Sequence, residues 1–236
     1  AVDGVSLDIG HGEILGLVGE SGCGKTTLGR MSINLIKPTS GEIIFDGEDI
    51  LKLDNPSLKA LRPKMQIIFQ DPFSSLNPRF TVERIIGEAM LVHGLAERSN
   101  LRSKVTEIMQ KVGLPNSFIN RYPHEFSGGQ RQRIGIARAL SLNPRYLVGD
   151  EPVCALDVTI QAQITNLLQD LQEKENISIL FISHDLPVIR QMCDRVAVMR
   201  KGNICEINTT ENIFNKPKHS YTKELISLIP KIESVN

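Results

Sequence analysis

One nine-residue segment, from Gly19 to Thr27, constrains the fold of this chain more than any other part of the sequence. It reads GESGCGKTT and fits the pattern G-x-x-x-x-G-K-[ST], which forms a phosphate-binding loop between a strand and a helix. Residues 14–18 are a short apolar run, typical of a buried parallel strand, and residues 27–33 can continue as a helix. The segment therefore predicts an α/β fold that binds a nucleotide at this loop.

The residue types in this loop suit an anion. Glycines let backbone N–H groups turn inward, and the helix N-terminus adds its dipole, so phosphates can be bound without a metal or acidic ligand. In this pattern the lysine reaches the β- and γ-phosphates and the following hydroxyl ligates Mg²⁺. The alternative is a chance match in a glycine-rich turn, and the loop alone does not say what the nucleotide is used for. The expected nucleotide-binding residues are Gly19, Glu20, Ser21, Gly22, Cys23, Gly24, Lys25, Thr26 and Thr27.

Composition restricts the class of protein. A length of 236 residues allows one large domain, or a core with a subdomain. Lys plus Arg equals Asp plus Glu, at 27 each, so no overall charge argues for nucleic acid as a partner. No apolar run approaches the roughly 18 residues that span a bilayer, and no secretory signal is visible. The four cysteines are far apart and form no C-x-x-C pair, which fits a reducing, cytosolic setting.

Apolar runs alternate with helical periods along the chain, which favours a parallel sheet with helices packed against it. Residues 5–9 alternate before a Gly-His-Gly turn, so we expect them to pair as a strand with residues 14–18. Residues 73–125 contain several helical stretches and no convincing β run. Further strands are expected near 42–47, 65–69, 145–149, 177–182, 196–199 and 204–207, and helices near 82–91, 102–112, 130–142, 160–171, 211–215 and 221–229.

These patterns predict an α/β fold with a P-loop NTPase core and a mainly parallel sheet. An N-terminal antiparallel β subdomain and an inserted helical subdomain complete it. The whole chain, 1–236, would form a single domain, with the core in residues 1–70 and 144–236 and the helical subdomain in residues 71–143.

Four further groups of residues carry candidate chemistry. A Ser-Gly-Gly run precedes a helical stretch and offers a second anion site at a helix start, although this run taken alone favours an ordinary N-cap with flexible glycines. Two adjacent carboxylates end an apolar strand, where α/β folds bind ligands, and a solvated acidic turn is the alternative. One glutamine and one histidine end two other strands, where either could be a surface or structural residue. In chain order the residues are Gln70; Ser127, Gly128, Gly129 and Gln130; Asp150 and Glu151; and His184.

The loop and these groups, in this order, resemble the ATP-binding subunit of an ABC transporter over essentially the whole chain. The resemblance implies that two such domains pair head to tail, so that Ser127, Gly129 and Gln130 act on the partner's ATP. It also implies that Asp150 holds Mg²⁺, through water, and that Glu151 polarises the attacking water.

The same resemblance assigns three more positions. His184 would contact the γ-phosphate, and Gln70 would contact Mg²⁺ or the water. Asp157 falls in the dimer-contact loop, where Cys154 replaces the usual Ser.

Stretches around the motifs are similar to the ATP-binding subunits of oligopeptide and dipeptide importers. They lie at residues 19–25, 69–79, 122–126 and 155–158, and at His219-Ser220-Tyr221-Thr222 with Leu225 and Pro230. The implied partners are two membrane-spanning permease subunits, a second ATP-binding subunit and, indirectly, an extracytoplasmic solute-binding protein. The implied location is peripheral, at the cytoplasmic face of the cell membrane. Rival interpretations are a soluble ABC ATPase without a permease, an importer of nickel or a sugar oligomer, and a small-molecule kinase.

Two features depart from this subfamily. No residue here matches the aromatic side chain that the family stacks on adenine, and we expect no iron–sulfur cluster because no cysteine-rich tail is present. Cys23, inside the loop and beside Lys25, is either a reactive thiol that ATP protects from alkylation or an inert thiol that faces the core.

Overall fold

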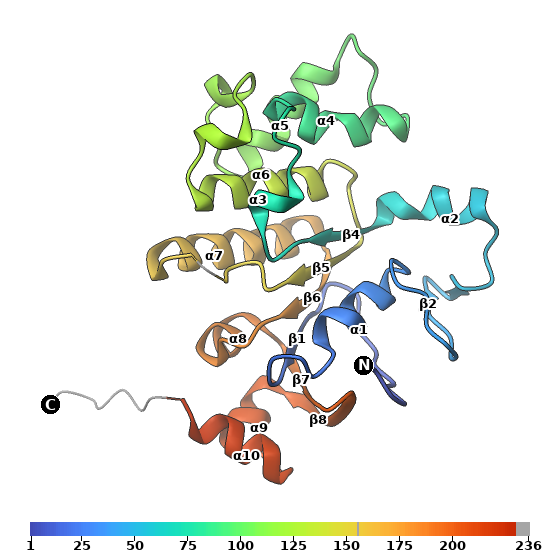
Figure 1. Cartoon of the computed structure of the whole chain (residues 1–236), viewed down its shortest axis with the longest axis vertical. Helices are drawn as coiled ribbons and strands as arrows, with labels where there is room; N and C mark the ends of the chain where they lie inside the picture. The colour runs from blue at the N-terminus through green and yellow to red at the C-terminus, as the bar shows by residue number, and fades with distance from the viewer. Residues whose placement is uncertain (155, 230–236) are drawn as a thin grey trace, which may run out of the picture.

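The computed structural model describes residues 1–154 and 156–229, and a six-stranded sheet lies at its centre (Figure 1). All neighbouring strands pair in parallel except the last two, β7 and β8, which are antiparallel. The predicted mainly parallel sheet is therefore confirmed. In spatial order the strands are β4 (Met65–Ile68), β5 (Tyr146–Asp150), β6 (Ser178–Ile182), β1 (Ile14–Val18), β7 (Arg195–Arg200) and β8 (Asn203–Thr209).

The central strands are mostly apolar because both faces of the sheet are covered. Side chains alternate between two apolar clusters, so Ile14 and Val18 of β1 face one cluster while Leu15 and Leu17 face the other. Every residue of β1 is buried.

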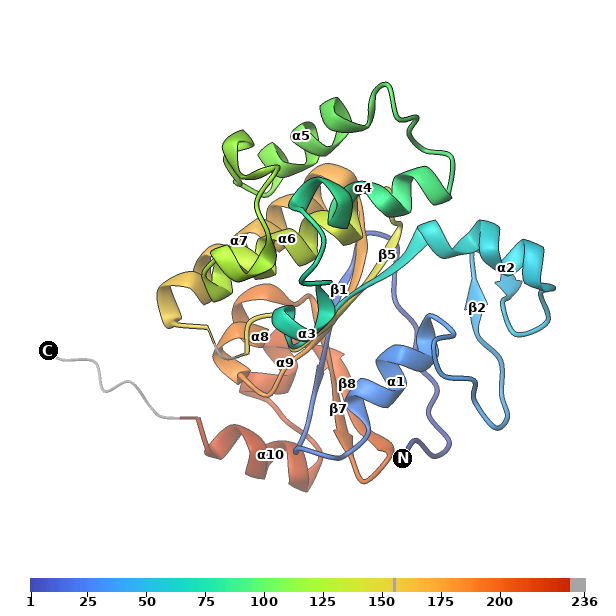
Figure 2. The same cartoon turned by 45° about the horizontal axis from the view of Figure 1, so that its top comes forward.

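Most helices cover the first face. α6 (Gly128–Leu140) and α7 (Val158–Glu175) lie side by side over the sheet, and α4 (Val82–Val92) and α5 (Leu101–Lys111) lie beyond them (Figure 2). This face also carries α3 (Pro72–Ser75), α8 (Leu186–Met192), α9 (Thr210–Asn215) and α10 (Ser220–Ser227). α10 lies at the end of the molecule far from α4 and α5 (Figure 1).

The second face is covered by α1 (Lys25–Ser32), α2 (Asn55–Leu61) and a small hairpin of β2 (Ile44–Phe45) with β3 (Glu48–Asp49). Helices thus occupy most of residues 72–140, where the sequence predicts the helical insertion. The division into residues 1–70 with 144–236 and residues 71–143 remains a prediction. Within the described ranges, no helix combines the length and apolar character that a membrane span requires.

The predicted strand at residues 5–9 is wrong. β1 is already paired on both sides, with β6 and β7, so it has no edge on which residues 5–9 could form a ladder. Instead Leu7 and Ile9 pack on the second apolar cluster without regular pairing. The antiparallel part of this region is therefore reduced to the β2–β3 hairpin.

Gly29 of α1 permits the close approach of that helix to the sheet. A Cβ there would lie 2.7 Å from Cδ1 of Ile182 and 3.0 Å from Cγ1 of Val148, and both side chains are fully buried. Gly135 of α6 gives the matched comparison, because no atom lies within 4 Å of a Cβ built there.

We expect Gly135→Ala to be as stable as wild type, or more stable by up to about 1 kcal/mol, because Ala has a higher helix propensity than Gly. Gly29→Ala gains the same propensity but overpacks the helix–sheet contact, so it should be less stable than Gly135→Ala by at least about 1 kcal/mol. Urea unfolding of the two variants measures the difference. Equal stabilities would show that the contact at Gly29 is not tight.

Candidate nucleotide site

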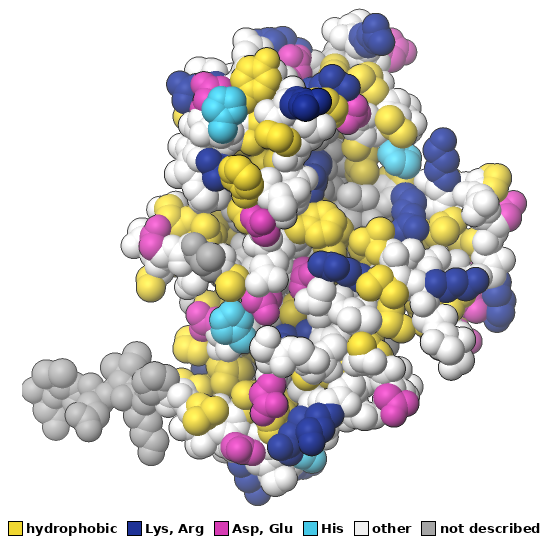
Figure 3. Space-filling view, in the orientation of Figure 1, with side chains coloured by type: hydrophobic (Ala, Val, Ile, Leu, Met, Phe, Trp, Pro, Cys, Tyr) yellow, Lys and Arg dark blue, Asp and Glu magenta, His cyan; other side chains and the backbone are white. Residues whose placement is uncertain are grey.

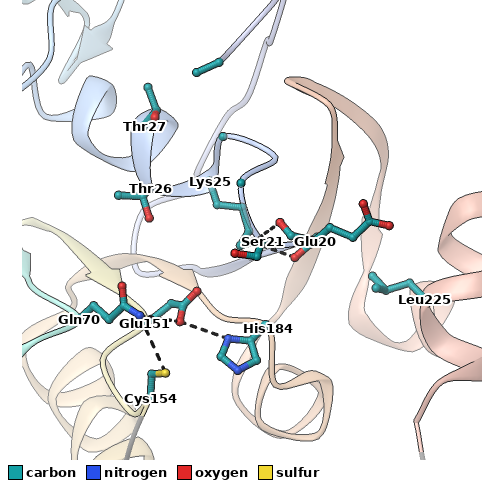
Figure 4. Close-up of a pocket in the computed structure, with 14 residues that line it drawn as sticks. Glu20, Ser21, Lys25, Thr26, Thr27, Gln70, Glu151, Cys154, His184 and Leu225 are labelled. Atoms are coloured by element: carbon teal, nitrogen blue, oxygen red, sulfur yellow. Dashed lines mark hydrogen bonds and ion pairs between the residues drawn. The ribbon is translucent and has the colours of Figure 1, made fainter.

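Four parallel strands deliver their carboxyl ends to one edge of the sheet, where α/β folds bind ligands. β1 leads into the loop at residues 19–27, β4 is followed by Gln70, β5 ends at Asp150 beside Glu151, and β6 precedes His184. A cavity of about 690 Å³ opens there, within the range of small-molecule sites (Figure 4). Its lining residues are Ala1, Gly19, Glu20, Ser21, Gly22, Gly24, Lys25, Thr26, Thr27, Gln70, Glu151, Cys154, His184 and Leu225.

Close backbone packing holds the loop in shape. Gly19 has a φ of 153°, and a Cβ on it would lie 2.1 Å from the carbonyl oxygen of Met199. Gly24 has a φ of 111°, and a Cβ on it would lie 2.2 Å from the carbonyl oxygen of Ala1. Any side chain at these two positions would collide with backbone, so the loop requires glycine there.

The ammonium group of Lys25 lies inside the loop. Its Nζ donates to the carbonyl oxygens of Gly19, at 2.8 Å, and Glu20, at 2.9 Å, and the residue is only 5% exposed. Among the described residues, no carboxylate forms a salt bridge with it. Nζ also lies 4.0 Å from the sulfur of Cys23. A buried cation held by dipoles and a thiol, without a carboxylate, is stabilised strongly by an anion, and the cavity admits one. The loop therefore fits a phosphate chain.

Oxygen donors lie beside the start of α1. The hydroxyl of Thr26 donates to Oδ1 of Asp150 at 2.7 Å, and Asp150 is 1% exposed. Nη2 of Arg30 lies 3.4 Å from Oδ2 of the same carboxylate. Hydroxyl and carboxylate oxygens are the ligands that Mg²⁺ prefers, so these residues fit the predicted metal.

The carboxylate of Glu151 is held by two side chains (Figure 4). Nε2 of Gln70 donates to its Oε2 at 3.2 Å, and Nδ1 of His184 lies 3.2 Å from the same oxygen. Glu151 has a left-handed φ of 49°, and its N–H donates to the carbonyl of Ile182 at 3.0 Å. A strained backbone that its neighbours enforce is common at functional sites. The structure thus brings together three residues that the sequence analysis singled out separately, Gln70, Glu151 and His184.

Cys154 extends this group. Ligand atoms of Glu151, Cys154 and His184 all lie within 4.8 Å of one another. Thiolate, imidazole and carboxylate together suit zinc-type ions rather than Mg²⁺.

The Ser-Gly-Gly segment lies outside this cavity. Ser127 and Gln130 form a reciprocal cap at the start of α6, with Ser127 accepting from the Gln130 N–H at 3.3 Å and donating its own N–H to Oε1 of Gln130 at 3.1 Å. Ser127 and Gly128 are exposed, and Gly129 is buried against Ile160. Asp157 caps α7 by accepting from the N–H of Ile160 at 2.9 Å. None of these residues lines the cavity of its own chain.

Sequence reasoning missed two contacts of the site. Arg30 contacts Asp150 from one turn beyond Thr26, a spacing that the helical period could have revealed. The hydroxyl of Tyr221 contacts the loop at Glu20, and no local signal in the sequence reports such a distant neighbour.

The Cys23 thiol packs in the second apolar cluster, is 7% exposed and does not line the cavity. Nζ of Lys25 lies 4.0 Å from the Cys23 sulfur, but the burial of the thiol limits the access of a reagent and so favours the inert thiol. Cys154, by contrast, lines the cavity.

We therefore expect N-ethylmaleimide to modify Cys154 faster than Cys23, and bound ATP to slow the reaction at Cys154. Site-resolved mass spectrometry over a time course measures both rates. Cys23→Ser should leave the fast reaction intact, whereas Cys154→Ser should remove it. Faster modification of Cys23 would contradict the burial of its thiol.

Comparisons with known proteins agree with this geometry. Residues 2–154 match the family described as ABC transporter. The chain is 54% identical over 231 residues to the oligopeptide transport ATP-binding protein AppF of Bacillus subtilis, covering 98% of this chain and 70% of AppF. It is 49% identical over 239 residues to the dipeptide transport ATP-binding protein DppF of Lactococcus lactis, covering 100% of this chain and 77% of DppF.

Among solved structures, the dimeric post-hydrolysis state of the ATP-binding cassette MJ0796 bound to ADP and Pi is similar, with a TM-score of 0.80. The two are 30% identical, and the similarity covers 89% of this chain and 90% of the other. The family match covers most of the chain, and relatives about 50% identical match nearly its whole length. The chain belongs to the ABC transporter family.

Proposed function

We propose that this chain is the ATP-binding and ATP-hydrolysing subunit of an ABC importer, and that it couples head-to-tail dimer closure and hydrolysis to the uptake of peptides. One observation carries the ATP site: the buried ammonium of Lys25 lines a cavity beside a glycine-rich loop, and its partners are two carbonyl oxygens and one sulfur, with no carboxylate in a salt bridge among the described residues. The transported class rests on relatives named for oligopeptide and dipeptide transport.

Residues 19–27 would hold the phosphates of ATP, with Lys25 on the β- and γ-phosphates. Mg²⁺, when bound, neutralises phosphate charge, and Thr26, Gln70 and Asp150 would hold it, Asp150 through water. The hydrogen bond between Thr26 and Asp150 supports this set, because it places two oxygen donors together at the loop.

Glu151 is proposed as the group that polarises the attacking water. Gln70 and His184 both contact Oε2, so that oxygen is already oriented and Oε1 is left to accept a proton. His184, which is mostly exposed on the cavity wall, would contact the γ-phosphate. Its contact with Glu151 would make the orientation of the base depend on what His184 touches.

Hydrolysis is proposed to need a second ATP-binding subunit, of this chain or of a related one. Ser127, Gly128, Gly129 and Gln130 form a capped helix start that does not line the cavity of its own chain, which fits a role on the partner's nucleotide. Asp157 would act at the same dimer contact.

Two permease subunits are the proposed membrane partners, with an extracytoplasmic solute-binding protein acting through them. Residues 71–79 are the proposed docking surface, and Phe73 within them is 59% exposed. The chain would sit peripherally on the cytoplasmic face of the membrane.

A nucleic-acid partner is not part of the proposal. The formal net charge is zero, and basic and acidic side chains are intermingled on the face in Figure 3.

Glu151→Gln should keep ATP binding and slow hydrolysis at least about a hundredfold, because a positioned base contributes about 10² to 10⁴ in rate. Single-turnover hydrolysis and ATP titration measure the two effects, and Glu173→Gln, on the exposed face of α7, is the matched control. A loss below about tenfold would remove Glu151 from this role.

His184→Ala should depress the turnover of ATP more than the affinity for ATP.

Cells that lack this chain should lose uptake of a labelled oligopeptide and regain it with the wild-type gene but not with Glu151→Gln. Two membrane-spanning subunits should also co-purify with the chain. Restored uptake of nickel or of a sugar oligomer instead would replace the solute class, and purification without any membrane protein would favour a soluble ABC ATPase.

A further inference from the structure

The C-terminal helix α10 contacts the phosphate loop through one buried hydroxyl. The N–H of Glu20 donates to Oη of Tyr221 at 3.1 Å, although the two residues are 201 positions apart. Tyr221 is 2% exposed, whereas Glu20 is exposed at the cavity, so this contact joins a buried side chain to the surface of the loop. One turn further along α10, Leu225 reaches the wall of the cavity (Figure 4).

The opposite side of the same loop segment rests on the end of β7. Gly19 packs against the carbonyl of Met199 so closely that no Cβ fits between them. The next residue, Arg200, places its guanidinium 4.5 Å from the centre of the Tyr221 ring, a cation–π distance. The segment from Gly19 to Glu20 is therefore enclosed by the end of β7 and by α10.

A carboxylate on β8 fixes the start of α10. Glu206 accepts from the backbone N–H groups of Lys218, at 3.0 Å, and His219, at 2.9 Å. Burial raises the pKa of Glu206, but these two hydrogen bonds favour its charged form and leave the pKa below its usual value. His219 in turn caps the helix, since its Nδ1 accepts from the N–H of Tyr221 at 3.1 Å.

We propose that Tyr221 is a positioning residue for ATP, and that α10 holds the Glu20 peptide in its binding orientation. The Gly19–Glu20 peptide is held at both ends, because Tyr221 accepts from the N–H of Glu20 and Lys25 donates to the carbonyl of Gly19. The proposal rests on the proposed function, in which Lys25 turns to the phosphates when ATP binds. The Lys25 contact with the Gly19 carbonyl is then weakened, and Tyr221 remains as the side-chain hydrogen-bond partner that limits rotation of this peptide, beside the close packing of Gly19 on Met199.

The test compares Tyr221→Phe with Tyr146→Phe, which removes a buried tyrosine hydroxyl that contacts Ser32 at the far end of α1. Isothermal titration with Mg-ATP should give Tyr221→Phe a Kd about fivefold above wild type, the effect of one ordinary hydrogen bond. Tyr146→Phe should stay within about twofold. In hydrolysis assays KM should rise with Kd while kcat stays within about twofold, because Tyr221 contacts neither Glu151 nor His184.

A second variant tests the route through α10. Glu206→Ala loosens the start of the helix without touching the loop, so it should also weaken ATP binding. If both residues act through the Tyr221 hydroxyl, the Kd of the double variant for ATP should not exceed the higher Kd of the two single variants. Hydrogen exchange at the Glu20 amide of the nucleotide-free chain should be faster in Tyr221→Phe and in Glu206→Ala than in wild type.

The outcomes separate the two proposals. If wild type does not bind ATP, the proposed function fails. If wild type binds ATP while Tyr221→Phe binds it equally well, with Glu20 exchange unchanged, the nucleotide site stands and the role of α10 is overturned. If the losses of ATP-binding free energy in Tyr221→Phe and Glu206→Ala add fully in the double variant, the common route through Tyr221 is overturned.

Discussion

The buried ammonium of Lys25 is the constraint on which the rest of the structure depends. Removing a charge from water is costly, and the contacts that offset this cost within the chain are the carbonyl dipoles of Gly19 and Glu20 and the sulfur of Cys23 at 4.0 Å. Those two carbonyls point at the ammonium because the loop is packed so tightly that Gly19 and Gly24 admit no side chain. An anion in the cavity completes the arrangement, which makes ATP binding a consequence of how the loop is built.

The parallel sheet explains why the other groups lie within reach of this charge. The carboxyl ends of parallel strands meet at one edge of the sheet. At this edge β4 brings Gln70, β5 brings Asp150 and Glu151, and β6 brings His184 to the loop that follows β1. Helices on both faces leave that edge open and let the central strands be mostly apolar. The capped start of α6 lies apart from this edge in its own chain, which fits a site that two subunits complete together.

Local patterns in the sequence predict most of this arrangement. Apolar runs place β1, β5 and β6 within a residue of their bounds, and the loop motif places α1, because strand burial and glycine geometry are local properties. Residues 5–9 alternate like a strand but do not pair, since pairing depends on which edges of β1 are occupied by distant segments. The thiol direction of Cys23 and the contact of Tyr221 with Glu20 depend on tertiary packing, and no local pattern encodes either.

Lys25→Met tests the central claim most directly, because it keeps the length of the side chain and removes the charge. Thermal unfolding with and without Mg-ATP provides the readout. The account predicts that ATP raises the unfolding temperature of wild type but not of Lys25→Met, and that nucleotide-free Lys25→Met is at least as stable as wild type, since a buried charge has been removed. An equal ATP-induced rise in both proteins, or a marked loss of stability in nucleotide-free Lys25→Met, would contradict it.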